Sequence, residues 1–281
     1  TTIKDKIYIV DSKGKKLTDQ TDIDRVKLII ILLKQFTYFS ANSPNPFQSI
    51  TRFIDLITTV LSKSNQSLWI TMLSENGNMK KLARILGASD FIWEDFIRIQ
   101  TESLLPILNP RTTFEIEKLT AESFHIELNI LLKNASTFEE KMIQVNKFKN
   151  DWTTYIDLHH ILKQLNFRQF SKCLSNLADV IISKSCKIIE KRLRHTYGHP
   201  KTFAGFNAIY TIVGLGKFGG TALGYASDIE LMLIYSDDGS TSGKTSISNS
   251  RYFNQFVEML SKFIQTKRDG IFSIDLRLRP Y

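Results

Sequence analysis

The spacing of apolar residues changes once along the chain. Between residues 22 and 194, apolar side chains recur every three or four positions, as Val26, Ile29, Ile30 and Leu33 do, and this period predicts α-helices. Proline and glycine residues separate the periodic segments and predict where each helix stops. The expected helices are 22–43, 47–62, 68–73, 79–86, 91–99, 113–132, 137–165 and 168–194.

A segment with Gly198, Pro200 and Gly205 reads as a linker or domain boundary, and after it the period changes. Alternating or continuous apolar runs predict strands, one helix is amphipathic, and one loop is polar. The expected strands are 208–213, 229–235 and 271–278, with a helix at 249–265 and a mobile loop at 239–250. We therefore expect an α+β protein in which an N-terminal extension (1–21) and an all-helical region (22–195) precede a domain (196–281) with a small mixed β-sheet.

Charge and composition narrow the classes of function. The net charge of +9 suits an anionic partner such as a nucleotide, a nucleic acid or an acidic protein surface, without choosing among them. The longest aliphatic run, Leu28 to Leu33, is much shorter than the ~20 residues of a membrane span. Cys173 and Cys186 lie outside any zinc-binding pattern, and there is no secretion signal, so we expect a cytoplasmic protein with reduced thiols.

A cluster of positive charge closes the long helix at 168–194. Lys191, Arg192 and Arg194 lie where the negative pole of the helix dipole favours cations. A solvated helix end is the simpler interpretation, and a phosphate-binding role is the alternative.

A glycine-rich turn follows the first of these strands. Gly214, Gly216 and Gly219 have the spacing of a dinucleotide-binding fingerprint. However, only the seven residues from Thr221 to Ser227 separate Gly220 from Asp228. A crossover helix between parallel strands needs a dozen residues or more, so the dinucleotide interpretation is disfavoured.

Two acids at the head of the next strand favour a metal-dependent nucleotide site instead. Asp228 and Glu230 are two positions apart on a predicted strand, so both side chains leave the same face. Adjacent carboxylates repel one another unless a cation lies between them. Mg²⁺ prefers one or two carboxylates together with substrate phosphates.

The turn itself offers groups for those phosphates. Gly219 and Gly220 can present backbone N–H groups, Lys217 can add a point charge, and Ser227 can donate a hydrogen bond from its hydroxyl group. For Ser227, a bond to the backbone at the start of the strand is an equally good interpretation.

The terminal strand repeats the pattern. Asp275, Arg277 and Arg279 alternate with apolar residues and predict a charged face. Alone, this pattern would favour a ladder of ion pairs. Beside Asp228 and Glu230 it favours Asp275 as a third metal-binding carboxylate, and two metal ions could then stabilise both the attacking and the leaving oxygen. Arg277 and Arg279 could neutralise phosphate charge.

Two stretches resemble a known family. GLGKFGGTALGYASDIELMLIY (214–235) and DLRLRP (275–280) are similar to the signature of the polymerase-β nucleotidyltransferase superfamily, and more specifically to the glutamine-synthetase adenylyltransferases. ILGASDFI (85–92) and LSNLAD (174–179) are similar more loosely. The resemblance implies a polymerase-β-like nucleotidyltransferase domain at 196–281. It also implies a bifunctional enzyme that attaches AMP from ATP to a tyrosine of glutamine synthetase, or removes it by phosphorolysis to give ADP.

The resemblance also assigns roles and partners. Asp228 and Glu230 correspond to the family's metal-binding pair, and Asp275 to its third acid, with Mg²⁺ (two ions) as cofactor and ATP, or phosphate and ADP, as substrate or product. The family usually has Asp where this chain has Glu230, whose carboxylate reaches one bond further. Glutamine synthetase, and the nitrogen-signal protein PII, are the expected partners. The chain begins with Thr and ends soon after Arg279, so we expect a nucleotidyltransferase unit truncated late.

Two other functions stay open. One is a nucleotidyltransferase of the same fold that acts on nucleic acid. The other is a degenerate unit that binds a nucleotide or a partner without catalysis. The sequence does not decide between the adenylylating and the AMP-removing direction.

Overall fold

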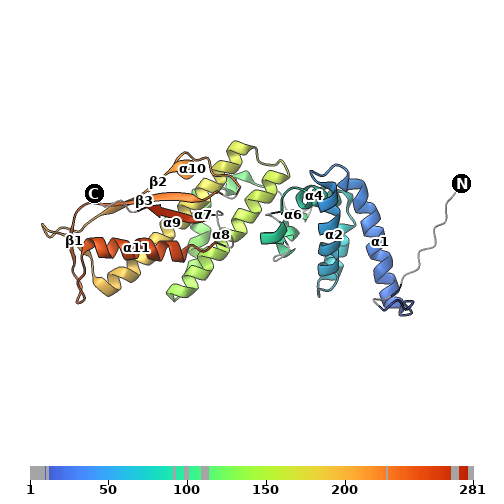
Figure 1. Cartoon of the computed structure of the whole chain (residues 1–281), viewed down its shortest axis with the longest axis horizontal. Helices are drawn as coiled ribbons and strands as arrows, with labels where there is room; N and C mark the ends of the chain where they lie inside the picture. Colours follow the sequence, from blue (N-terminus) through green and yellow to red (C-terminus); the bar gives the residue numbers. More distant parts are fainter. Residues whose placement is uncertain are drawn as a thin grey trace. The chain divides into compact units, whose positions relative to one another are not determined.

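The computed structural model describes residues 10, 13–90, 93–97, 101–108, 114–225, 227–266 and 272–277. The chain divides into two compact units, Thr1–Arg111 and Thr112–Tyr281 (Figure 1). None of the described helices is long and apolar enough to cross a membrane.

In the described part of the first unit, the regular elements are helices, and an isolated bridge joins Val10 and Lys16. Asp19 caps its first helix by accepting hydrogen bonds from the backbone N–H groups of Thr21 and Asp22. Phe36 of that helix stacks on Phe53 with ring centroids 3.7 Å apart, and both side chains are fully buried. The elements are α1 (Gln20–Ser40), α2 (Pro46–Val60), α3 (Gln66–Leu73), α4 (Asn76–Leu86), η1 (Trp93–Ile97), η2 (Thr101–Leu104) and α6 (Leu105–Leu108).

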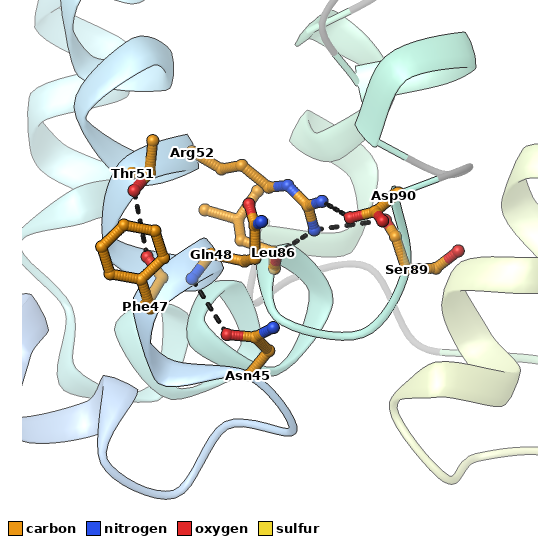
Figure 2. A network of polar contacts seen from close by, with 8 residues as sticks. All are labelled: Asn45, Phe47, Gln48, Thr51, Arg52, Leu86, Ser89 and Asp90. Atoms are coloured by element: carbon orange, nitrogen blue, oxygen red, sulfur yellow. Dashed lines mark hydrogen bonds and ion pairs between the residues drawn. The ribbon is translucent and has the colours of Figure 1, made fainter.

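A buried arginine closes the C-terminal end of α4 (Figure 2). Arg52 of α2 donates to the backbone carbonyls of Leu86, at 2.7 Å, and Ser89, at 3.3 Å. Its guanidinium also pairs with Asp90, whose own side chain is largely exposed. The carbonyls at a helix end have no partner within the helix, and a cation favours the negative pole of its dipole. Arg52 therefore joins α2 to the segment where the sequence ILGASDFI lies.

The second unit begins with a short 3-10 turn, η3 (Ile116–Lys118), and three long helices. These are α7 (Ala121–Lys133), α8 (Phe138–Ile161) and α9 (Phe167–Tyr197). Thr137 and Glu140 form the capping box that their spacing predicts at the start of α8. Asn166 and Gln169 form a second box at the start of α9.

Two small sheets follow. β2 (Tyr210–Gly214) pairs antiparallel with β3 (Ile229–Tyr235), which pairs in parallel with β5 (Ile274–Arg277). β1 (Pro200–Thr202) pairs antiparallel with β4 (Gly239–Thr241). The one-turn helix α10 (Gly216–Gly219) follows β2, and α11 (Asn249–Phe263) follows β4 and runs alongside the strands in Figure 1.

One hydrophobic core joins the long helices to the sheet. Leu177 of α9, Leu231 of β3 and Phe256 of α11 are all fully buried members of this cluster. A three-stranded sheet needs such cover because it cannot exclude enough water alone. The boundary between the two compact units therefore lies after Arg111, and not near residue 195, where the spacing of apolar residues changes.

The predicted α+β class with a small mixed sheet is confirmed. Three local expectations were wrong. The helix expected from residue 113 begins at Ala121, because Thr120 caps it. The segment expected as a linker contains β1. The polar loop expected at 239–250 begins with β4, which pairs with β1. Local composition does not reveal such backbone pairing between distant segments.

Replacing Arg52 tests the closure of α4. Arg52→Met keeps the aliphatic volume but leaves the buried Leu86 carbonyl without its donor, so we expect the free energy of unfolding of the first unit to fall by about 2–4 kcal/mol. Asp90→Asn keeps an acceptor at an exposed position and should cost less than about 1 kcal/mol. Urea titrations of the two variants measure the difference, and equal losses would contradict this account.

Candidate functional site

The two acids of the central strand occupy the positions that the sequence predicts. Asp228 directly precedes β3 and is exposed, while Glu230 is half-buried at the strand's second position. Ile229 and Leu231 are fully buried between and after them. The predicted alternation is therefore confirmed, with the apolar side chains in the core and the acids on the other face.

β5 brings the third acid beside the second. Asp275 is the register partner of Glu230 in the parallel β3–β5 pair, so both side chains project from the same face of the sheet. Asp275 is half-buried and has a polar interaction of its own. Of Arg277 the structure describes the backbone alone, and Arg279 lies outside the described residues.

The donor chemistry suits Mg²⁺, but the described side chains do not form a three-carboxylate cluster. Among the residues that the structure describes, no group of three or more His, Cys, Asp and Glu side chains is arranged to hold a metal ion. A Mg²⁺ site needs only one or two protein carboxylates when phosphates and waters complete it. Asp228 and Glu230 fit that simpler requirement, and Asp275 lies in register with Glu230.

The glycine turn lies directly against Glu230. Leu215 donates its N–H to the Glu230 carbonyl at 2.8 Å, which continues the β2–β3 ladder into the turn. Gly216 has φ +51°, and a Cβ there would lie 2.9 Å from Glu230 Oε1. A Cβ on Gly219 would lie 2.4 Å from the carbonyl oxygen of Gly214. Gly219 is thus required by its close approach to the backbone at the end of β2, and Gly216 by its positive φ.

Two backbone N–H groups of the turn already have hydrogen-bond partners within it. The N–H groups of Gly219 and Gly220 already donate to the carbonyls of Leu215, at 2.9 Å, and Gly216, at 3.1 Å. Phosphate contacts from these two groups would require those bonds to be exchanged. Lys217 is exposed in the same turn, so its ammonium group can reach a bound anion. The phosphate-binding role of all three residues stays a prediction.

Ser227 joins the connector, the segment from Thr221 to Ser227 that follows the glycine turn, to the sheet. Its buried Oγ accepts a hydrogen bond from the N–H of Gly224 at 3.0 Å, and its carbonyl accepts from the N–H of Phe272 at 2.9 Å. The backbone-bonding alternative for this hydroxyl is therefore confirmed. A phosphate contact from Ser227 stays a prediction.

The connector is also held by aromatic residues that sequence reasoning did not assign to the site. The Tyr225 hydroxyl lies 2.6 Å from Nδ1 of His160 on α8, and its ring lies 4.7 Å from that of Phe170 on α9. Burial lowers the pKa of His160, so at neutral pH its uncharged ring can accept a hydrogen bond from the Tyr225 hydroxyl group. Nearby Asp157 is fully buried, and burial raises its carboxyl pKa well above the ordinary value. Burial, with the charge of Asp157 second, raises the pKa of Tyr225.

Backbone strain marks both flanks of the site. Thr221 at the end of the turn has φ +53°, and Phe272 before β5 has φ +54°. Non-glycine residues rarely adopt this left-handed region, and such strain concentrates at functional sites. No sequence signal identifies either position.

A groove of about 760 Å³ lies between α9, the outer edge of β2 and the glycine turn. Gly214, Gly219 and Thr221 line it on the turn side. Asp179 and Lys187 line it on the α9 side. None of the three candidate metal ligands is among its lining residues, so the turn separates this groove from the acidic face.

The two adjacent glycines should respond differently to alanine. Gly219→Ala must displace the Gly214 carbonyl, so we expect a loss of about 1–3 kcal/mol in the free energy of unfolding. Gly220 has φ −86°, and a Cβ there meets the Gly216 carbonyl at an ordinary 3.5 Å. Gly220→Ala should leave stability unchanged or raise it by up to about 1 kcal/mol. Denaturant titration measures both, and a larger loss for Gly220→Ala would contradict the geometry.

Asp157 should make stability depend on pH. Because burial raises its folded-state pKa, its favourable contribution is complete below the unfolded-state pKa of about 3.9 and is lost as the pH rises toward the folded-state value. Asp157→Asn mimics the neutral acid, so the variant should melt at a higher temperature than the parent at pH 7 and match it near pH 4. Asp179→Asn, at an exposed position of α9, is the control without such a trend. A pH-independent difference for Asp157→Asn would refute the assignment.

Comparisons of the sequence with known proteins identify a family. The sequence model of a family described as glutamate-ammonia ligase adenylyltransferase matches residues 79–281. Three relatives, each named bifunctional glutamine synthetase adenylyltransferase/adenylyl-removing enzyme, come from Psychromonas ingrahamii, Hahella chejuensis and Alteromonas mediterranea. They are 24%, 27% and 25% identical over 84%, 85% and 89% of this chain, respectively.

The chain spans only about a quarter of the length of these relatives, at 25%, 25% and 26%. The family match nevertheless covers most of the chain, from α4 through the whole sheet. This chain belongs to the glutamate-ammonia ligase adenylyltransferase family.

Proposed function

We propose that the chain is a nucleotidyltransferase unit that moves AMP between a nucleotide and a tyrosine of glutamine synthetase, with Mg²⁺ as cofactor. The observation that carries the proposal is the position of Glu230, which lies against the glycine turn and in register with Asp275. The names of the family and of its relatives support the class of reaction and the protein substrate.

Each candidate residue would have a role that follows from its position in the sheet or the turn. Asp228 and Glu230 would hold Mg²⁺ from the exposed face at the head of β3, where a nucleotide can approach. Bound Mg²⁺ would supply charge neutralisation for phosphate oxygens. Asp275, beside Glu230, would orient the attacking hydroxyl or phosphate and accept its proton. Lys217 would approach the phosphates from the turn.

The tightness of the turn explains how Glu230 could be positioned. The absence of a Cβ at Gly216 leaves room for the Glu230 carboxylate directly above the backbone. A carboxylate that is already confined loses less entropy when it binds an ion. The longer side chain at this position is therefore accommodated by the glycine and remains usable as a ligand.

Both directions of transfer fit these residues, since phosphorolysis is the same displacement with phosphate as the acceptor. We propose glutamine synthetase as the protein substrate because the relatives' names contain it. We also propose the nitrogen-signal protein PII as a regulator, on the ground of the sequence resemblance alone.

A second candidate is a unit that binds nucleotide or partner without catalysis. It is favoured by one observation, the lack of a three-carboxylate metal arrangement among the described residues. The two candidates differ in what they predict for turnover, so one experiment separates them.

The test offers the chain two substrates in the presence of Mg²⁺. These are unmodified glutamine synthetase with ATP, and AMP-modified glutamine synthetase with phosphate; intact-protein mass spectrometry and ADP release are the readouts. We expect AMP to be gained in the first or released as ADP in the second, and Asp228→Asn should lower the rate by ~10²–10³-fold because it removes a charge needed in the transition state.

Glu258→Gln is the matched control, since Glu258 is an exposed acid on α11 away from the sheet's acidic face, and its rate should equal that of the parent. Mg²⁺-dependent ATP binding without turnover would support the non-catalytic unit. Turnover that survives Asp228→Asn unchanged would refute the proposed site.

A further inference from the structure

A second hollow of about 370 Å³ lies in the helical part of the second unit, between α7, α8 and α9. We call it the basic groove. Positively charged or titratable side chains surround it: Lys141, Lys184, Lys187, Lys191, Arg192 and His195. No carboxylate is among its described lining residues.

The charges gather because of helix geometry. Lys184, Lys187, Lys191 and His195 follow one another at intervals of three and four residues, so α9 presents them on one face. Lys141 is added from α8. The sequence singled out the end of this helix as basic, but only the packing of α8 beside α9 completes the cluster.

Most of this charge lacks a counter-charge within the described part of the chain. Lys141, Lys187 and Lys191 form no ion pair with any described residue. Arg192 is paired only with Glu139, at 3.6 Å, and both of these side chains are largely exposed. An exposed pair at that distance compensates little charge.

The positive charges of the basic groove contribute to lowering two pKa values, one of a lining residue and one of a neighbouring histidine. Burial and, second, the charge of Lys187 lower the pKa of Lys184. Burial and then the charges of Lys184 and Lys187 lower the pKa of His125 on α7. A bound anion would relieve this repulsion.

The floor of the groove is apolar. Leu132, Phe138 and Ile188 form it, and the Arg192 guanidinium lies 4.5 Å from the centroid of the Phe138 ring. Lysine stems can extend this apolar surface while their ammonium groups stay in water. A hollow of this size can hold one large apolar side chain of a partner on its apolar floor. The cations at its rim can then contact charged residues of the same partner.

We propose that the basic groove docks an acidic segment of a partner protein, with one large apolar side chain of that segment inserted between α7, α8 and α9. Charge complementarity selects acidic residues around the anchor, and the apolar floor selects the anchor itself. A nucleic acid fits less well, because phosphates need a track of cations and gain little from a floor of Leu132, Phe138 and Ile188. The inference does not depend on nucleotidyl transfer, since none of the candidate catalytic residues lines the groove.

The test measures binding of a fluorescent peptide of about ten residues, aspartate and glutamate except for one central phenylalanine, at roughly physiological salt. Two double variants of the full 281-residue chain reverse charges at i and i+4 on the same helix. Lys187→Glu with Lys191→Glu changes the groove. Arg168→Glu with Lys172→Glu changes two exposed positions near the start of α9 and alters net charge equally.

We expect the groove variant to weaken peptide binding at least about tenfold and the control variant to change it by less than about twofold, with unchanged far-ultraviolet circular dichroism for both. A peptide with alanine in place of phenylalanine should bind the parent at least about fivefold more weakly. The proposal would be overturned if the two variants lost peptide affinity equally, or if replacing the phenylalanine had no effect. It would also be overturned if a thymidine oligonucleotide of equal charge bound more tightly than the peptide and the groove variant abolished that binding.

Discussion

The arrangement of the candidate site depends on the close approach between the end of β2 and the helical turn that follows it. A Cβ on Gly219 would lie only 2.4 Å from the Gly214 carbonyl oxygen, so no side chain fits there, and a Cβ on Gly216 would lie 2.9 Å from Glu230 Oε1. These contacts fold the turn back over β3 and bring the exposed Lys217 to the same end of the sheet as Asp228. A bulkier turn would move Lys217 away from Asp228 and Glu230, and the candidate site needs these cationic and acidic groups close together.

The sheet that carries this turn depends in turn on the helices. Three short strands bury too little apolar surface to be stable alone, and β3 is covered on its core face by side chains from α9 and α11. Burying each of Ile229, Leu231 and Leu233 contributes roughly 1.5–3 kcal/mol. That one-sided cover leaves the opposite face, with Glu230 and Asp275, free for polar groups. Packing of one face of the sheet thus leaves the opposite face available for polar and catalytic side chains.

Helix α9 has several roles at once. Leu174, Leu177 and Ile181 place its inner face in the core. Phe170 packs against Tyr225 of the connector, and the Lys187–His195 portion faces the basic groove. The candidate active site and the basic groove both lie in the second compact unit, Thr112–Tyr281.

The sequence by itself determined the class of the fold, the extent of β3, the capping box at Thr137 and the face shared by Asp228 and Glu230, because these follow from local periodicity and short-range hydrogen bonding. It also identified the family, through the glycine turn and the acids after it. Only the tertiary structure decided that Asp275 is the register partner of Glu230, that β1 pairs with β4, and that His160 holds Tyr225. These contacts join residues far apart in the chain, and their geometry is set by packing rather than by neighbouring residues. For the same reason the N–H groups of Gly219 and Gly220 could be named as donors from the sequence, but only the folded turn shows that they already donate to its own carbonyls.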